Sequence, residues 1–194
     1  MPLDTGPTVT AILGTSRPNN YTGMALDLAV DEAAKYARVN LLRAADLDLG
    51  FPGSGSGTGA KALQEAVRAA DAVILATPEY HGGMAAMMKL IIENLGFPSV
   101  LAGKPVALLG TAAGAIGAIK SLEQLRSVCS HVGALVLPSV VSVAGVQRVF
   151  SAEGVCQDPK VEARIRGLAV TVHEYLQRHV CPGLVLEQAV RDDG

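Results

Sequence analysis

Charged residues, aromatic residues and long apolar runs are all scarce in this sequence of 194 residues. Charged residues make up 18% of the chain, aromatic residues 4%, and tryptophan is absent. The formal net charge is −2 and no run of Lys or Arg appears, which argues against a nucleic acid or an anionic membrane as partner. No apolar stretch approaches the roughly 20 residues that span a membrane. Hydrophobic residues nevertheless make up 49%, and this apolar composition favours a homo-oligomer, either a homodimer or a homotetramer.

Cysteine is scarce as well. Cys129, Cys156 and Cys181 are odd in number and form no C-x-x-C pair, so they are typical of thiols in a reducing compartment rather than of a disulfide or metal site. The first residues, MPLDTGPT, lack the basic start and apolar run of a signal peptide. We therefore expect a cytoplasmic protein with no metal site.

What the sequence does contain is a regular alternation of short apolar runs and helical patterns. We expect strands over residues 8–13, 39–42, 72–76, 106–109 and 134–137. Apolar residues at helical spacing predict helices over residues 22–37, 63–70, 84–95, 116–128 and 161–175. Short strands that alternate with helices indicate a parallel sheet covered on both faces. The predicted fold is a single domain over residues 1–194, a flavodoxin-like three-layer α/β/α sandwich with a five-stranded parallel sheet in the order 2-1-3-4-5.

The loop after the first expected strand, residues 14–22 (GTSRPNNYT), gathers hydrogen-bond donors at the start of a helix. A phosphate monoester at this position meets free N–H groups and the positive end of the helix dipole. Arg17 can add two charge-assisted hydrogen bonds to its oxygens. The alternative is that Asn20 or Thr22 caps the helix with no ligand present. The density of donors in so few residues favours the anion site.

The loop after the third expected strand, residues 77–83 (TPEYHGG), combines a rigid residue with two permissive ones. Pro78 fixes its own φ and keeps Thr77 extended, whereas Gly82 and Gly83 allow backbone conformations that other residues resist. Ligands of open α/β sheets bind at the carboxyl ends of the strands. The loop is therefore expected to aim peptide groups at a flat polar ligand.

Three side chains of this loop invite a more specific role. Glu79 and His81 suggest acid–base chemistry, but no further His or Asp stands beside them in the sequence, so we assign both to binding. Tyr80 can pack an aromatic edge beside a flat ring, or it can be a partly buried loop aromatic.

The loop after the fourth expected strand, residues 109–117 (LGTAAGAIG), consists almost entirely of small residues. Small residues let a ligand approach the backbone, although close packing of helix on strand explains them equally well. A Walker A interpretation fails, because no GK[ST] closes the loop. Three loops, after the first, third and fourth strands, are thus expected to converge on one edge of the sheet.

Two of these loops resemble motifs of the NADPH-dependent FMN reductase family. TPEYHGG followed by a helix is similar to the TPEYNxS loop that holds the isoalloxazine ring in that family. Residues 14–22 are similar to its GSxRxxSxN phosphate loop, with Thr15, Arg17, Asn20 and Thr22 at the four polar positions. By the same resemblance, residues 109–117 lie along the ribityl chain and the pyrimidine edge of the flavin.

The resemblance implies FMN as cofactor and NADPH or NADH as co-substrate. It places cofactor binding on the three loops and implies no catalytic side chain and no metal ligand. The residues expected to bind the cofactor are Thr15, Ser16, Arg17, Asn19, Asn20, Tyr21, Thr22, Pro78, Glu79, Tyr80, His81, Gly82, Thr111, Ala112, Ala113, Gly114 and Gly117.

The implied activity is that of an FMN-dependent NAD(P)H oxidoreductase. Flavin N5 takes a hydride from NAD(P)H, and the electrons pass to a small acceptor such as a quinone, a flavin, an azo compound or a metal oxyanion. Family members commonly continue the helix as LKNxxDW, whereas residues 89–97 read KLIIENLGF, so the subfamily and its acceptor stay open. The alternatives are a flavodoxin-like electron carrier, which a charge of only −2 and few aromatics disfavour, and a non-enzymatic nucleotide-binding module.

Four segments are less regular. Residues 44–59 contain FPGSGSGTG and can be a lid or, with more weight, a plain surface loop. The helix over residues 84–95 is apolar nearly all round, which favours a subunit interface over simple core burial. Residues 140–158 have no predicted place. The tail after residue 179 can pack on a partner subunit or fray.

Overall fold

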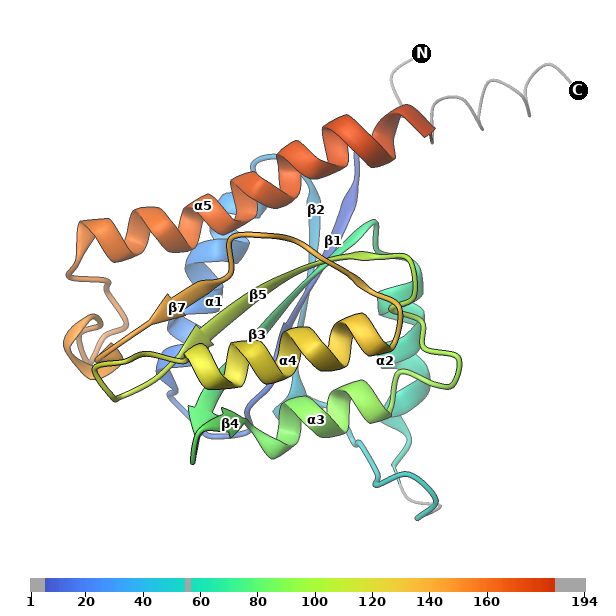
Figure 1. The fold of residues 1–194 in the computed structure, drawn as a ribbon, viewed down its shortest axis with the longest axis horizontal. Helices are drawn as coiled ribbons and strands as arrows, with labels where there is room; N and C mark the ends of the chain where they lie inside the picture. Colours follow the sequence, from blue (N-terminus) through green and yellow to red (C-terminus); the bar gives the residue numbers. More distant parts are fainter. Residues whose placement is uncertain (1–5, 55–56, 184–194) are drawn as a thin grey trace, which may run out of the picture.

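The computed structural model describes residues 6–54 and 57–183. Its centre is a parallel sheet with the strand order β2-β1-β3-β5-β6 (Figure 1). The bounds are Arg38–Arg43 for β2, Thr8–Leu13 for β1, Ala72–Tyr80 for β3, Pro105–Thr111 for β5 and Leu135–Val136 for β6. Taken in chain order, these are the five predicted strands. The predicted order 2-1-3-4-5 is therefore confirmed. The predicted count of five strands is too low, because the described residues form a sheet of seven strands, in which β4 (Gly83–Met84) pairs with β3 and β7 (Val141–Val143) pairs with β5.

Helices cover both faces of the sheet, which makes three layers (Figure 1). On one face, the sheet packs against α1 (Tyr21–Ala33) and α5 (Pro159–Tyr175). On the other face, it packs against α2 (Gly59–Arg68), α3 (Ala86–Glu93) and α4 (Ile119–His131). Strand β3 shows why both faces must be apolar: Ile74 belongs to the first core, while Val73 and Leu75 belong to the second. A strand buried on both sides reads as a continuous apolar run, which is what made it visible in the sequence.

The segment expected to be a loop, residues 77–83, is mainly a β-hairpin. Strand β3 continues through Tyr80, and β4 (Gly83–Met84) returns antiparallel to it. The turn consists of His81 and Gly82, with φ values of 50° and 75°. Two consecutive positive φ values are the signature of the type I′ turn that joins tightly paired strands. Pro78 does not end the strand, and it lies within the buried part of β3.

The fifth strand of the sheet is interrupted, and this places the segment that the sequence left unassigned. After β6, the chain passes Pro138 and Ser139, whose φ is 69°. It then resumes as β7 (Val141–Val143), which also pairs parallel with β5. A 3₁₀ turn, Val146–Arg148, follows directly. The interruption carries the fifth strand to the same carboxyl edge as its neighbours, so a fourth loop reaches that edge.

Several helix boundaries differ from those predicted. Helix α1 ends at Ala33, four residues earlier than expected, and α4 starts at Ile119, three residues later. Helix α3 spans only Ala86–Glu93, because the residues before it belong to β4. Helix α5 starts at Pro159 with Asp158 as its N-cap, since the Asp158 carboxylate accepts hydrogen bonds from the next N–H groups.

The described part of residues 44–59 folds back on itself. The Asp48 carboxylate accepts hydrogen bonds from the Thr58 N–H at 2.9 Å and the Thr58 hydroxyl at 3.1 Å. The Asn94 side chain donates to the Gly50 carbonyl at 3.0 Å and ties the loop to the end of α3. These contacts support the surface-loop interpretation over the lid.

Within residues 6–54 and 57–183, no helix is both long and apolar enough to cross a bilayer. A π-helical turn, Leu176–Val180, extends α5. The expectations for the tail fall largely on residues 184–194, which lie outside the described residues.

Candidate functional site

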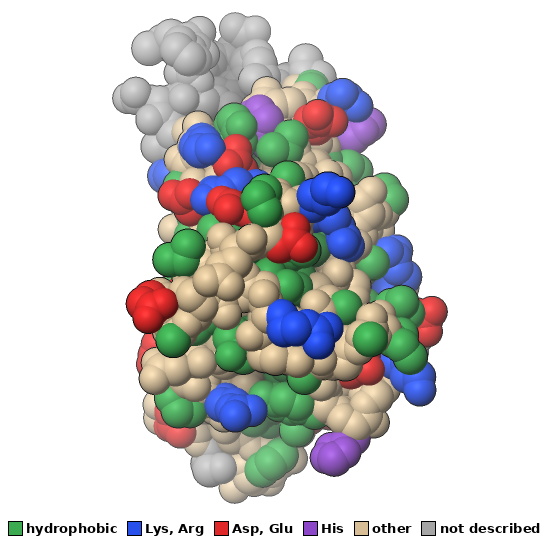
Figure 2. Space-filling view, turned by 90° about the vertical axis from the view of Figure 1, so that its left-hand side faces the viewer, with side chains coloured by type: hydrophobic (Ala, Val, Ile, Leu, Met, Phe, Trp, Pro, Cys, Tyr) green, Lys and Arg blue, Asp and Glu red, His purple; other side chains and the backbone are tan. Residues whose placement is uncertain are grey.

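A cleft of about 610 Å³ opens at the carboxyl edge of the sheet, where the loops after β1, β3, β5 and β7 meet. On the side of the molecule seen in Figure 2, acidic and basic side chains are interspersed with polar and apolar ones. The cleft volume of about 610 Å³ suits a cofactor. The cleft is lined by Arg17, Pro18, Asn19, Asn20, Tyr21, Thr22, Pro78, Glu79, Tyr80, Thr111, Ala112, Ala113, Val146 and Gln147.

The first wall of the cleft is the β1–α1 loop. At its first residue, Gly14, the backbone lies very close to Ala76 and Met88. The Gly14 N–H donates to the Ala76 carbonyl at 2.8 Å, and a Cβ on Gly14 would lie 2.8 Å from the Cβ of Met88. Glycine is therefore required where the loop leaves the sheet beneath α3. Asn20 then caps α1: its Oδ1 accepts from the Gly23 N–H at 2.6 Å, and its Nδ2 donates to the Arg17 carbonyl at 2.7 Å. The helix-cap alternative thus describes the Asn20 side chain.

Several hydrogen-bond donors of the same loop have no acceptor among the described residues. Among the described residues, the backbone N–H groups of Ser16, Asn19 and Asn20 have no protein acceptor. The Arg17 guanidinium is exposed and has no hydrogen bond or ion pair with any described residue. Helix α1 adds its own free N–H groups and the positive end of its dipole. This combination fits a phosphate monoester, as the sequence predicts.

Two threonine hydroxyls join the first wall to the third. Thr22 Oγ1 and Thr111 Oγ1 lie 2.6 Å apart, and both residues are buried. Thr15 is also buried, and its Oγ1 accepts from the Arg17 N–H at 3.3 Å. These three hydroxyls therefore shape the loop from inside.

The second wall is the β3–β4 hairpin. Pro78 is buried, and the Tyr80 side chain is 43% exposed at the cleft. Glu79 lines the cleft, but its carboxylate is engaged elsewhere: Oε2 accepts from the Ser121 N–H at 3.0 Å. Thr77 Oγ1 accepts from the Ala85 N–H at 3.1 Å, at the start of α3. The hairpin therefore offers the cleft mainly backbone and the Tyr80 ring.

The third wall, residues 111–113, is supported by the turn after β7. The Val146 N–H donates to the Ala112 carbonyl at 3.0 Å, and Gln147 Nε2 donates to the Ala113 carbonyl at 3.2 Å. Sequence reasoning missed Val146 and Gln147 because it had no place for residues 140–158. The signal available was the run VVSVAG, which reads as a strand once Pro138 is accepted as an interruption rather than an end.

Most of the predicted cofactor-binding residues come together in the cleft. Some do not line it, namely Thr15, Ser16, His81, Gly82, Gly114 and Gly117. Pro18 does line it, although no role was predicted for it. Among the residues away from the cleft edge, Thr15 is turned inward and His81 and Gly82 form the exposed turn of the hairpin.

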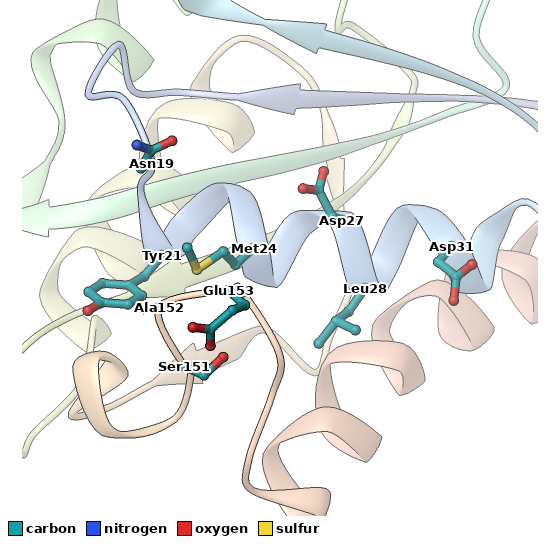
Figure 3. A pocket seen from close by; sticks show the side chains of 10 residues that line it. Asn19, Tyr21, Met24, Asp27, Leu28, Asp31, Ser151, Ala152 and Glu153 are labelled. Carbon is teal, nitrogen blue, oxygen red and sulfur yellow. The ribbon is translucent and has the colours of Figure 1, made fainter.

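A second cavity, of about 660 Å³, lies on the far side of the start of α1 (Figure 3). It shares Asn19 and Tyr21 with the cleft and faces the loop of residues 151–154. Its polar lining is acidic, with Asp27, Asp31 and Glu153. Carboxylates repel a phosphate, so this cavity does not fit the phosphate end of FMN although it is the larger one.

The described part of the chain offers little support for a metal site or a reactive thiol. It contains no group of three His, Cys, Asp or Glu residues placed to hold a metal ion. Burial raises the pKa of the Cys129 thiol to about 12, so this thiol stays protonated and inert.

A parallel sheet between two layers of helices, with a cleft at the carboxyl ends of its strands, defines a flavodoxin-like α/β fold. The sequence profile of the NADPH-dependent FMN reductases matches residues 7–148. The chain therefore belongs to the NADPH-dependent FMN reductase family, and the resemblance seen in the sequence is confirmed.

Relatives and solved structures agree with this assignment. The chain is 32% identical over 170 residues to an NAD(P)H-dependent FMN reductase of Pseudomonas aeruginosa, covering 81% of this chain and 89% of that one. It is 29% identical over 184 residues to a quinone reductase of Escherichia coli, with coverage of 88% and 95%. The flavoenzyme NAD(P)H:(acceptor) oxidoreductase FerB from Paracoccus denitrificans superposes with a TM-score of 0.74 at 23% identity, covering 89% of this chain and 98% of FerB.

These comparisons confirm the flavodoxin-like fold, and they support FMN and NAD(P)H as cofactor and co-substrate of an oxidoreductase. The structural likeness at 23% identity bears on the fold alone.

Proposed function

We propose that this chain is an FMN-dependent NAD(P)H oxidoreductase whose flavin lies in the cleft and reduces a small diffusible acceptor. The observation that carries the proposal is the unsatisfied donor set of the β1–α1 loop, at one end of a slot walled by backbone. The N–H groups of Asn19 and Asn20 and the Arg17 guanidinium, all on residues that line the cleft, would hold the phosphate. The hairpin and residues 111–113 would border the ring. Bound FMN would supply the redox chemistry, the transfer of electrons from NAD(P)H to the acceptor.

The acceptor is proposed to be a quinone or a free flavin, with azo compounds and metal oxyanions as further candidates. The E. coli relative is a quinone reductase, and the P. aeruginosa relative is an FMN reductase. The exposed Tyr80 ring at the cleft gives a flat acceptor an aromatic surface to pack on. A reducing compartment, and hence the cytoplasm, is proposed because all three cysteines are free.

Anaerobic absorption spectroscopy tests this function. The protein loaded with FMN should lose its visible flavin band on addition of NADPH or NADH and regain it on addition of a benzoquinone. A protein that takes up no FMN would overturn the proposal. Reduction only by a protein donor, with no direct oxidation of NAD(P)H, would favour the electron carrier instead.

We also propose that two copies associate through the outer faces of α3 and α4. A groove of about 580 Å³ runs between these helices, with Ile92, Val128 and Val132 in its lining. Phe97, at its edge, is fully exposed. Lys89 and Glu93 form an ion pair on the same face, so the face carries both signs of charge. An exposed apolar side chain beside an apolar groove, with balanced charge, suits a twofold contact in which each Phe97 enters the groove of the other copy.

Sedimentation velocity tests this contact. Phe97→Glu should shift the dimer or tetramer towards a smaller species, whereas Val155→Glu, at another exposed apolar side chain, should not. A wild-type monomer, or an unchanged assembly in Phe97→Glu, would contradict the proposed face. FMN binding, measured on the same samples, reports separately on the function.

A further inference from the structure

The β3–β4 hairpin is too short to hold its own shape. Only two residue pairs join its strands, Glu79 with Met84 and Tyr80 with Gly83. Its turn places His81, a residue with a side chain, at a φ of 50°. A left-handed conformation costs a residue with a side chain about 1–2 kcal/mol, and isolated two-stranded hairpins are marginal even when longer. Contacts outside the hairpin must therefore fix it.

Helix α4 supplies these contacts through two reciprocal hydrogen bonds. Glu79, on the outgoing strand, accepts from the Ser121 N–H of α4 at 3.0 Å. Gln124, one turn further along α4, accepts through Oε1 from the Met84 N–H of the returning strand at 2.9 Å. Each strand of the hairpin is thus tied to the same helix. The fit is close, because a Cβ on Gly83 would lie 3.1 Å from the Gln124 oxygen.

Helix α4 in turn depends on Glu79. Its own N-cap residue, Ala118, has no side chain that can accept a hydrogen bond from the first turn. The Glu79 carboxylate takes this role from another element and places negative charge at the positive end of the helix dipole. Helix α4 directly follows the loop that forms the third wall of the cleft. The contact between Glu79 and α4 therefore joins the second wall to the third.

We infer that Glu79 and Gln124 are positioning residues of the flavin site, a clasp that sets the separation between the hairpin and residues 111–113. This inference rests on the proposed binding of FMN in the cleft. Both side chains act through the walls: Glu79 through Ser121 and Gln124 through Met84. The clasp acts on the ring end of the cleft, while Arg17 and the β1–α1 loop act on the phosphate end.

The experiment compares the binding of FMN with that of riboflavin, which lacks the phosphate. Flavin fluorescence titrations are made with Glu79→Ala, Gln124→Met, Glu79→Gln and the control Glu123→Ala. Glu123 is exposed on α4 and has no hydrogen bond or ion pair among the described residues. Glu79→Ala and Gln124→Met should each weaken both ligands by the same factor, about 3- to 10-fold, as expected for the loss of one hydrogen bond.

Glu79→Gln separates the clasp from a direct flavin contact. Its amide oxygen can still accept from the Ser121 N–H, so both affinities should return to within about threefold of wild type. The control Glu123→Ala should behave as wild type.

Three results would overturn the inference. The first is unchanged affinity for both ligands in Glu79→Ala and Gln124→Met. The second is weakening of FMN alone, which would place Glu79 at the phosphate. The third is a Glu79→Gln protein that binds as poorly as Glu79→Ala, which would show that the hydrogen bond to the Ser121 N–H does not carry the effect. A wild-type protein that binds neither ligand would instead refute the proposed function.

Thermal melts of each flavin-free variant test whether misfolding causes a loss of affinity. Gln124 is exposed, so Gln124→Met is expected to fold as wild type does.

Discussion

The start of α1 separates two cavities of similar size, a cleft of about 610 Å³ and an acidic cavity of about 660 Å³. They share Asn19 and Tyr21, so the same helix turn faces both. In the acidic cavity, Asp31 is paired with Arg166 at 2.6 Å and Asp27 with Arg43 at 2.8 Å. In the cleft, Arg17 has no such partner in the described chain. Volume alone does not distinguish the two cavities.

The two cavities differ in whether their charged side chains already have protein partners, and we propose that this difference, rather than volume, identifies the phosphate site. The ion pair of Asp27 with Arg43 connects α1 to β2, and that of Asp31 with Arg166 connects α1 to α5. Both pairs therefore stabilise the fold. Donors left without acceptors at a helix start cost free energy unless a ligand or water completes them. We propose that the phosphate of FMN accepts from these donors.

Arg17→Ala should weaken FMN binding by about 1.5–3 kcal/mol, or roughly 10- to 150-fold, the typical worth of hydrogen bonds to a charged group. Riboflavin binding should change little, because Arg17 is expected to contact only the phosphate. Fluorescence titration measures both. Arg68→Ala, at an exposed position on α2, is the matched control. Unchanged FMN affinity in Arg17→Ala would move the phosphate away from the β1–α1 loop.

The Thr22–Thr111 pair should govern stability more than affinity. Either Thr22→Val or Thr111→Val leaves one buried hydroxyl without a partner, which costs about 1–3 kcal/mol of unfolding free energy. The double variant removes both hydroxyls and should cost less than the sum of the two single changes. Urea unfolding of the flavin-free protein measures this. Additive costs would mean that the two hydroxyls do not share a hydrogen bond.

Much of the fold could be predicted from local pattern alone. Residues 72–76 are a continuous apolar run because helices cover both faces of β3. A run of this kind therefore predicts a buried parallel strand and a layer of helices on each side of the sheet. The donors of residues 15–22 were visible for a similar reason, since so many polar groups at one helix start exceed what a cap needs. The Asn20 side chain caps α1, and we propose that the other donors of this loop bind a ligand.

The remaining features depend on contacts between distant residues. Nothing near Glu79 in the sequence indicates that its carboxylate binds the Ser121 N–H, 42 residues away. The hairpin could not be distinguished from a loop, because its two pairs are held by Gln124 and not by its own composition. Val146 and Gln147 were missed because β7 resumes after an interruption whose register is set by β5.

The ion pairs of α1 should make a small, pH-dependent contribution to stability. Hydrogen bonding and charge from Arg166 hold the pKa of the Asp31 carboxyl below its usual 3.8. A lowered carboxyl pKa adds stability that is present above the ordinary pKa and is lost as the pH falls through the lowered value. The thermal midpoint of Arg166→Gln should therefore lie below that of wild type at neutral pH, and the difference should shrink in acid below about pH 3.8. A difference that persists at pH 2 would assign it to packing of the Arg166 side chain instead.

Glu153→Gln should have the smallest effect on FMN binding and is the sharpest test of which cavity holds the phosphate. Glu153 lines only the acidic cavity, and hydrogen bonding from Ser151 holds the pKa of its carboxyl below the usual value, so it is ionised at neutral pH. If the phosphate lies in the cleft, salt screens this exposed charge, and the FMN dissociation constant should stay within about twofold of wild type. If the phosphate lay in the acidic cavity, removing a facing negative charge would tighten FMN binding markedly, and the gain would fade at high ionic strength. Titrations at low and at high salt distinguish the two cavities.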